Sequence, residues 1–256
     1  MHFFWFRLRS YLSYRLWAKG SHSLHSPFLF DLYNKAIRPS RNFRLENVEK
    51  LRDELKKDHQ IIDLYDLKTK ENYRRTIGSI AKTSLSTRRF SAFLHLLICE
   101  QGYEKILETG TSLGINSLYL AGPDNVRKVA TLEASSVIAS IAKKQFNKLL
   151  QHKIEIKVGT LQDELESLLV KEQPDLCFID ADHRSEAVLK CVNLIMTHCP
   201  NIECIVIHDI YWSADMLAGW DTVVSDARFP LTIDIFEAGI IFPQKKMEKQ
   251  HFTLRF

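Results

Sequence analysis

Short apolar runs alternate with longer amphipathic stretches along the second part of the chain. From Tyr103 onward each short run has the length and apolar character of a buried strand, and the stretches between them carry apolar residues at helical spacing. The predicted strands are Lys105–Thr109, Lys128–Glu133, Lys153–Val158, Leu176–Asp180 and Glu203–His208. The predicted helices lie at Ile115–Ala121, Ser136–Leu150, Leu161–Lys171 and Glu186–His198. This alternation predicts an α/β fold with a mostly parallel sheet covered by helices on both faces.

The end of the chain adds one helix and two further strands to this pattern. A helix is predicted from Ala214 to about residue 226, and strands are predicted at Leu231–Phe236, or onward to Phe242, and at His251–Phe256. The polar segment 244–250 between these two strands favours antiparallel pairing. The expected sheet therefore has seven strands and ends in an antiparallel hairpin.

The first part of the chain has a different, mainly helical pattern. Helices are predicted at Leu45–Lys57 and at Ser86–Gln101, where Gly102 has the position of a helix C-cap. We expect residues 1–83 to form a helical extension or lid, and residues 84–256 to form the main domain.

Composition narrows the class of protein. The chain has 256 residues, of which 45% are hydrophobic and 26% charged, and no apolar run approaches the roughly 18 residues of a membrane span. The N-terminus lacks the pattern of a signal peptide. Five cysteines without C-x-x-C spacing indicate reduced thiols and no zinc site. We therefore expect a cytoplasmic protein.

Positive charge is concentrated in residues 1–44, which carry a net charge of +7 and many aromatic residues. Drawn as a helix, the first residues place Trp5, Leu8, Leu12 and Leu16 on one broad face. Such a helix packs on its own domain or on a second copy, or lies peripherally on an anionic membrane. No nucleic-acid-binding motif accompanies the charge, so we expect no nucleic-acid partner.

A carboxylate and two glycines surround the turn after the first predicted strand, in the order Glu108, Gly110, Gly114. Glycine lets the backbone approach a ligand closely. Glu133 ends the next strand, where an acid accepts hydrogen bonds from ribose hydroxyls. The third glycine of a dinucleotide fingerprint is absent, and Glu108 suits a cationic ligand better than a pyrophosphate.

This turn resembles that of the class I S-adenosylmethionine-dependent methyltransferases, with Ser112 where the family usually has glycine. The resemblance covers about residues 84–256. It implies that S-adenosylmethionine is the cofactor and that Thr160 lies near its adenine. The remaining cofactor-binding residues that it implies are Glu108, Gly110, Thr111, Ser112, Gly114, Glu133, Ala134 and Asp180.

Aspartate and histidine residues lie at the carboxyl ends of two later predicted strands. Asp180, Asp182 and His183 follow one strand, and His208 and Asp209 end the next. Singly, Asp182 or Asp209 could instead cap the following helix. Together, the two clusters favour a functional site.

These segments resemble small-molecule and sugar O-methyltransferases, whose fourth strand ends in a similar Phe-Ile-Asp-Ala-Asp-His run. The resemblance implies catalytic roles for Asp180, His183 and Asp209, with His183 as the general base and His208 as a weaker candidate. In metal-dependent relatives two such aspartates and a following asparagine bind a divalent ion. Ile210 stands at the third position and cannot ligate, so a magnesium or calcium ion is not favoured.

The predicted function is therefore methyl transfer from S-adenosylmethionine to a hydroxyl of a small molecule or of a sugar- or lipid-like acceptor. Two alternatives remain open: a non-catalytic protein that binds an adenosyl ligand on the same fold, and a dinucleotide-dependent oxidoreductase. Expected partners are the small-molecule acceptor and, through the N-terminal segment, a membrane surface or a second copy.

Overall fold

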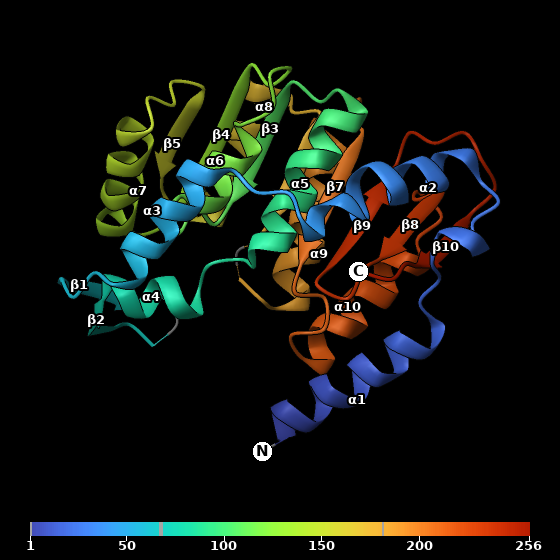
Figure 1. Ribbon diagram of the computed structural model, residues 1–256, viewed down its shortest axis with the longest axis horizontal. Helices are drawn as coiled ribbons and strands as arrows, with labels where there is room; N and C mark the ends of the chain where they lie inside the picture. The colour runs from blue at the N-terminus through green and yellow to red at the C-terminus, as the bar shows by residue number, and fades with distance from the viewer. Residues whose placement is uncertain (1, 67–68, 181) are drawn as a thin grey trace.

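The structure, a computed structural model, describes residues 2–66, 69–180 and 182–256. A twisted, mostly parallel sheet forms its centre (Figure 1). Within the described residues this sheet has eight strands in the order β10-β8-β9-β7-β6-β3-β4-β5. The strands are β3 (Lys105–Thr109), β4 (Lys128–Glu133), β5 (Ile154–Val158), β6 (Leu176–Ile179), β7 (Cys204–His208), β8 (Leu231–Asp234), β9 (Ala238–Phe242) and β10 (Gln250–Thr253). The α/β fold with a mostly parallel sheet is confirmed.

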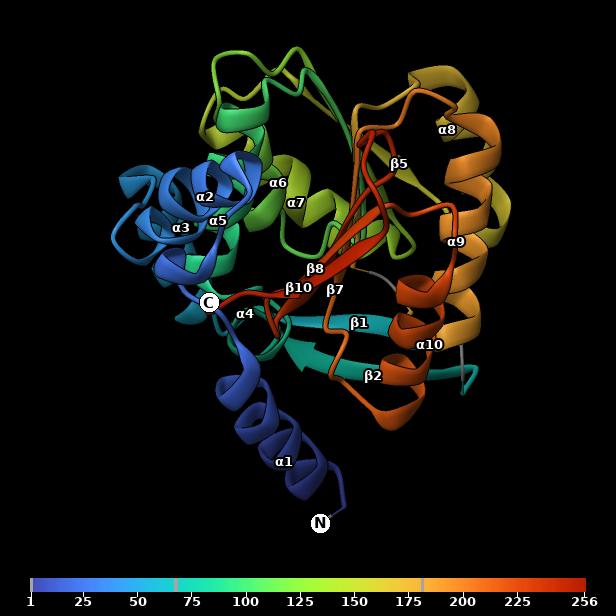
Figure 2. The ribbon, with the colours of Figure 1, turned by 90° about the vertical axis from the view of Figure 1, so that its right-hand side faces the viewer.

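Helices cover both faces of the sheet (Figure 2). One face carries α8 (Leu161–Glu172), α9 (Ser185–His198) and α10 (Ala214–Ser225), and the other carries α5 (Arg88–Gln101), α6 (Ile115–Leu120) and α7 (Ser136–Lys148). Hydroxyl side chains fix where several of these helices begin, because each accepts an amide hydrogen bond in the first turn. Thr87 caps α5, Ser135 caps α7, Thr160 caps α8 and Ser213 caps α10.

The N-terminal segment packs along the face that carries α5. It forms α1 (His2–Trp17), a 3₁₀ turn at Ser21–Ser23, α2 (Pro27–Leu32), a π-helical turn at Tyr33–Ile37, a 3₁₀ turn at Pro39–Arg41, α3 (Glu46–Lys56), β1 (Ile61–Asp66), β2 (Glu71–Thr76) and α4 (Ile77–Thr83). Leu29, Leu32 and Ile37 are buried in one core with Phe90 and Phe93 of α5. By contrast, α1 extends away from the sheet in both views (Figures 1 and 2).

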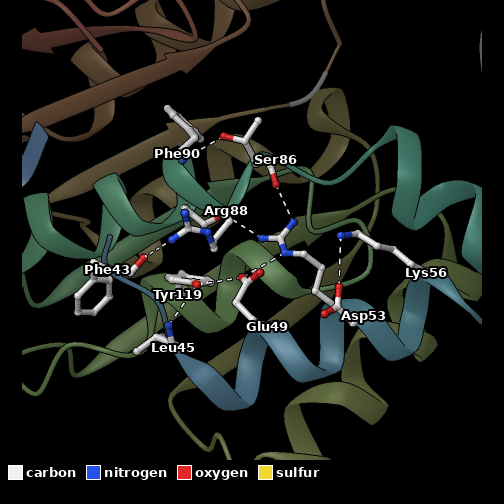
Figure 3. Close-up of polar contacts among 12 residues, drawn as sticks. Phe43, Leu45, Glu49, Asp53, Lys56, Ser86, Arg88, Phe90 and Tyr119 are labelled. Carbon is white, nitrogen blue, oxygen red and sulfur yellow. Dashed lines mark hydrogen bonds and ion pairs between the residues drawn. The ribbon is translucent and has the colours of Figure 1, made fainter. Parts of the chain in front are cut away.

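Polar contacts tie α3 to α5 and α6 (Figure 3). The Tyr119 hydroxyl donates to Glu49 Oε1 over 2.9 Å and accepts from the backbone N–H of Leu45. Arg52 donates to the carbonyl of Ser86 over 2.7 Å, and Arg88 donates to that of Phe43 over 2.9 Å. Partly buried, charge-assisted hydrogen bonds of this kind have well-defined geometry, so they hold α3 against the chain leading into α5.

The C-terminal strands differ from the prediction. The segment predicted as one strand at Leu231–Phe236, or onward to Phe242, forms two strands, because the chain turns at Phe236, which has a left-handed backbone (φ +68°). The antiparallel hairpin is therefore β8 with β9, and β9 also pairs antiparallel with β7. β10, at the predicted His251–Phe256, pairs parallel with β8 instead of antiparallel, and the separate strand β9 brings the sheet to eight strands.

A second sheet, β1 paired antiparallel with β2, was not predicted within the helical N-terminal region. Ile62 and Leu64 of β1 are buried and alternate with exposed residues, as a half-buried strand requires. β2 is mostly exposed and polar, so its sequence lacks the apolar alternation that signals a strand. Across the described residues, none of the helices combines the length and apolarity that crossing a bilayer requires.

Candidate active site

The carboxyl ends of β3, β4, β6 and β7 open onto a cavity of about 370 Å³. Residues from these strand ends form one side of it: Gly110, Ser112, Glu133, Asp180, His183, His208, Asp209 and Trp212. The other side comes from β1, β2, α4 and the chain that follows, with Ile138 of α7: Leu64, Tyr73, Arg75, Ile80, Thr83, Ser84, Leu85, Ser86 and Ile138. The structure thus brings the two predicted clusters together at one edge of the sheet.

The turn after β3 has an unusual backbone. Gly110, Ser112 and Gly114 all have positive φ, of +91°, +49° and +82°. This conformation is strained for serine and explains why a glycine would suit the position of Ser112. A Cβ on Gly114 would lie 2.5 Å from the Phe146 ring, so this glycine is required for the packing of the turn against α7.

Glu133, at the end of β4, is held by two backbone N–H groups. Ser112 donates to its Oε2 over 2.9 Å, and Ser135 donates to its Oε1 over 3.0 Å. Burial raises the pKa of Glu133, and these backbone hydrogen bonds oppose that shift. A carboxylate has about four acceptor sites, so Glu133 retains capacity to accept hydrogen bonds from a ligand in the cavity.

A second cavity, of about 590 Å³, also reaches Glu133. It lies between the start of α7, including Ala134, and the β1–β2 hairpin, where Tyr65 and Tyr73 line it. Ala134 and Glu133 therefore lie together, as predicted. The hairpin forms the opposite wall of this cavity, which places a segment without a recognised motif directly against the predicted nucleotide site.

Glu108 lies beneath the turn and does not line either cavity. It is fully buried, and its carboxylate accepts hydrogen bonds from Ser117, from Thr131 (2.7 Å) and from Asn116 (3.2 Å). Burial raises the pKa of Glu108 to about 7, against the effect of these hydrogen bonds. The prediction placed Glu108 beside a cationic ligand; in the structure it supports α6 from below.

Two threonines of the predicted cofactor site also lie outside the cavity lining. Thr111 is buried, and its hydroxyl lies 2.7 Å from that of Thr131. Thr160 is the N-cap of α8, where its hydroxyl interacts with Asp163 over 2.6 Å. Both side chains fix the local backbone, and the role of Thr160 near an adenine stays a prediction.

Asp180 and His208 form the closest charged pair in the described cavity lining. His208 Nδ1 lies 2.8 Å from Asp180 Oδ1, and Asp209 Oδ2 lies 3.8 Å from the same nitrogen. Burial lowers the pKa of His208, but the charge and hydrogen bond of Asp180, together with the charges of Asp209 and Glu237, outweigh it and raise this pKa to about 9. His208 is therefore a cation at neutral pH.

Asp209 lies where three segments meet. Its backbone has φ +53°, and its N–H donates to the carbonyl of Glu237 over 2.7 Å. Arg7 Nη2 of α1 lies 3.7 Å from Asp209 Oδ1, and the Arg7 guanidinium lies 5.6 Å from the centre of the Trp212 ring. The helix-capping alternative for Asp209 is wrong, because Ser213 caps α10.

His183 lines the cavity and packs against Trp212, with ring centres 5.2 Å apart and an interplanar angle of 31°. The neighbouring Asp182 has φ +55° and accepts a hydrogen bond from Arg184 over 2.8 Å. Asp182 does not cap α9, because the amide of Ser185 donates to Asp215. His183 thus faces the cavity on a strained turn, with an aromatic ring behind it.

Two residues of this site, His208 and Arg75, have little or no signal in the sequence. His208, the weaker candidate for the base, lines the cavity beside Asp180; the strand pattern alone does not show which way the last residue of β7 turns. Arg75 of β2 also lines the cavity and is positioned by Ser79 and Thr83. No cluster of three metal-ligating side chains occurs among the described residues.

Comparison with known proteins gives a consistent assignment. A family model described as a methyltransferase domain matches residues 107–210. The SAH-bound O-methyltransferase from Bacillus cereus superposes with a TM-score of 0.57 at 17% identity, covering 80% of this chain and 94% of that one. The SAH-bound methyltransferase PaMTH1 from Podospora anserina gives 0.56 at 16% identity, covering 79% and 97%.

A third structure, the O-methyltransferase TomG from Streptomyces achromogenes in complex with SAM, gives a TM-score of 0.53 at 16% identity and covers 63% of this chain and 82% of that one. No curated protein matches the chain in sequence. The family match includes the β3 turn, the end of β4 and both strand-end clusters. Residues 107–210 therefore match a methyltransferase domain, and the chain has the fold of the class I S-adenosylmethionine-dependent methyltransferases, as its sequence predicts.

Proposed function

We propose that this protein transfers the methyl group of S-adenosylmethionine to a hydroxyl group of a small acceptor, with His183 as the general base. One observation carries the proposal. A single cavity is lined both by the predicted nucleotide-binding residues Ser112 and Glu133 and by the side chains Asp180, His183 and His208. Donor and acceptor would thus meet in one enclosed space, as a methyl transfer requires.

The residues present fit the cofactor. Glu133 is fixed by the amides of Ser112 and Ser135 and keeps acceptor capacity for a ribose diol. Ala134 and the β1–β2 hairpin enclose the adjoining cavity, which offers room for the adenine. Asp180 supplies negative charge toward a cationic ligand. S-Adenosylmethionine, when bound, supplies a methyl group already activated by its positively charged sulfur.

The two histidines have different roles in this proposal. His208 is cationic at neutral pH and orients Asp180 through their hydrogen bond, so it has no free site for a proton. His183 is not held by such an ion pair and faces the cavity beside Trp212. A ring nitrogen of His183 therefore accepts the hydroxyl proton of the acceptor as its oxygen becomes methylated.

The acceptor class follows from the remaining walls. Leu64, Tyr73, Ile80 and Leu85 form an apolar side, and Arg75 adds one cation. This combination suits a ring or chain that carries a hydroxyl and a polar or anionic substituent. A divalent ion is not part of the proposal, because Ile210 follows Asp209 and is buried.

The test is an acceptor screen with the purified protein. S-Adenosylhomocysteine formation is measured with S-adenosylmethionine and a panel of catechols, phenols and sugars, and methylated products are identified by mass spectrometry. We expect release that depends on a hydroxylated acceptor. Binding of S-adenosylmethionine without turnover by any acceptor would instead support the non-catalytic alternative.

A further inference from the structure

One face of α1 is firmly attached to the body of the protein. The buried Tyr14 hydroxyl donates to the carbonyl of Leu254 over 2.6 Å and accepts from the backbone N–H of Phe256 over 2.7 Å. Tyr11 contacts the Phe236 ring edge-on at 5.1 Å, and Ala18 is buried. These contacts fix the rotation of α1, so its opposite face has a defined direction toward the solvent.

Large apolar side chains are exposed on that opposite side. Leu16 is 82% exposed, Trp17 76% and Leu12 58%, and Trp5 on the same side is 62% exposed. Leu12 and Leu16 are four residues apart and therefore adjacent on the helix surface. A helix with large apolar residues all round ordinarily buries both sides. Here the protein itself buries only one of them.

Basic residues lie among and beside these apolar side chains, with Arg9 next to Trp5, Leu12 and Leu16 on the helix surface. Arg9, Arg15 and Lys19 are exposed, and α1 contains no acidic residue. Long basic side chains can lie along apolar surface while their charged ends reach a polar layer, and tryptophan favours the boundary between apolar and polar phases. The face therefore combines the two attractions that hold a helix on an anionic lipid surface.

We propose that α1 docks the protein on an anionic membrane surface, with Leu12, Leu16 and Trp17 inserted at the level of the lipid headgroups. A second copy of the chain is a poorer occupant. In a symmetric dimer through this face the same residues meet, so Arg9 and Arg15 of each copy would face like charges without a compensating acid. The proposal goes beyond methyl transfer and holds whether or not the cofactor binds.

The test is co-sedimentation of the full-length protein with large vesicles. Vesicles of phosphatidylcholine mixed with phosphatidylglycerol are compared with vesicles of phosphatidylcholine alone. The triple variant Leu12→Ser/Leu16→Ser/Trp17→Ser removes the apolar face, and Arg9→Gln/Arg15→Gln removes charge. The matched control Leu150→Ser/Val170→Ser changes two exposed apolar residues, 74% and 56% exposed, that lie outside α1.

We expect the wild type and the control to bind anionic vesicles equally and bind neutral vesicles at least about tenfold more weakly. The affinity of the triple variant for anionic vesicles should be at least about tenfold lower, since burial of each large apolar side chain is strongly favourable. The charge variant should lose a smaller part and be less sensitive to salt. Tryptophan emission of the wild type should shift to shorter wavelength on binding.

Three results would overturn the proposal. The first is no binding to anionic vesicles, and the second is equal binding to neutral ones. The third is a dimer in sedimentation velocity that the triple variant dissociates, without any vesicle binding, because this would assign the face to a second copy. Circular dichroism of each variant verifies that the fold is retained. Cofactor binding is measured separately, so failure of this proposal is distinct from failure of the proposed function.

Discussion

The two sides of the cavity are built in different ways. The side formed by β3 and β4 uses backbone amides, positive-φ turns and the Glu133 carboxylate, and it rests on the buried Glu108 beneath the turn. The side formed by β6 and β7 uses charged and ring side chains, and α1 reaches it through Arg7. β1, β2 and α4 close the space between the two sides.

The difference indicates that the two sides of the cavity have different functions. Backbone groups held by local turns recognise a ligand part that does not vary, which fits the nucleoside of the cofactor. Side chains gathered from distant segments can change without disturbing the sheet, which fits selection of an acceptor and the proton transfer. If this difference in function is correct, substitutions on the two sides should affect different measurements.

The largest expected effect is on catalysis. His183→Gln should lower the rate of methyl transfer by about 100- to 10,000-fold because the proton acceptor is lost. Its affinity for S-adenosylmethionine should remain close to that of the wild type, since His183 lies on the acceptor side. Rates at saturating acceptor and calorimetric affinities give the two values.

His198→Gln is the matched control, because His198 lies at the end of α9 and pairs with Glu166, which does not line the active-site cavity. It should retain the full rate. Retention of the wild-type rate by His183→Gln from about pH 6 to 8, the range in which histidine titrates, would contradict the assignment of the base.

The next effect is on folding, on the nucleotide side. Glu108→Ala leaves the buried donors of Ser117, Thr131 and Asn116 without an acceptor and should lower the free energy of unfolding by about 3 to 5 kcal/mol. Glu108→Gln should cost about 1 kcal/mol, because its amide can donate to Asn116 Oδ1, which has no partner in the described structure.

Urea denaturation of the two Glu108 variants measures this difference directly. Equal stability of Glu108→Ala and Glu108→Gln would show that the carboxylate does not organise α6. The comparison is informative because both variants remove the charge, and only one removes the acceptor oxygen.

Stability should also depend on pH in two different ranges, one set by Glu108 beneath the β3 turn and one set by His208 at the end of β7. Burial raises the pKa of Glu108 from 4.5 to about 7, so the folded state binds more protons than the unfolded state and loses stability as pH rises across that range. The pKa of His208 is raised from 6.5 to about 9, so its contribution is complete below pH 6.5 and is lost as pH rises toward 9. Each of these two pKa changes corresponds to roughly 3 kcal/mol of unfolding free energy.

Unfolding free energies measured at intervals between pH 4 and 10 test both shifts. Glu108→Gln should reduce the loss of stability with rising pH only in the range of the Glu108 shift, from pH 4.5 to about 7. His208→Asn should reduce it only in the range of the His208 shift, from pH 6.5 to about 9. A profile for His208→Asn that matches the wild type above pH 6.5 would mean that the Asp180–His208 pair does not bind a proton.

The regular elements were largely predictable from the sequence, and the reasons are local. β3 and β4 have the predicted bounds, and Gly102 ends α5 with a left-handed backbone (φ +74°). Buried parallel strands and capped helices carry strong short-range signals. The convergence of Asp180, His183 and Asp209 on one cavity followed from their positions at strand ends.

The remaining features depend on contacts between distant residues. The break at Phe236 is stabilised by its amide hydrogen bond to Asp234 and by its contacts with Tyr11 and Tyr211. β2 owes its strand conformation to pairing with β1, not to its own polar sequence. The buried position of Glu108 could not be predicted, because the sequence does not show that Ser117 and Thr131 turn inward to donate hydrogen bonds to it.

The smallest expected effect concerns backbone strain. Ser112→Gly should stabilise the protein by about 0.5 to 1 kcal/mol, because glycine adopts φ near +49° without the steric penalty that serine pays. Ser136→Gly, in the first turn of α7, should have the opposite sign through lost helix propensity. Thermal unfolding of both variants tests the pair; destabilisation by Ser112→Gly would show that the Ser112 side chain itself is needed.

The central claim is that the β3–β4 side of the cavity binds an adenosyl ligand. Its most direct test is calorimetric titration of the wild type and of Glu133→Ala with S-adenosylmethionine, S-adenosylhomocysteine and NAD. The account predicts micromolar binding of both adenosyl ligands, at least about tenfold weaker binding by Glu133→Ala, and no binding of NAD. Binding of NAD in preference to S-adenosylmethionine, or no adenosyl binding at all, would contradict it.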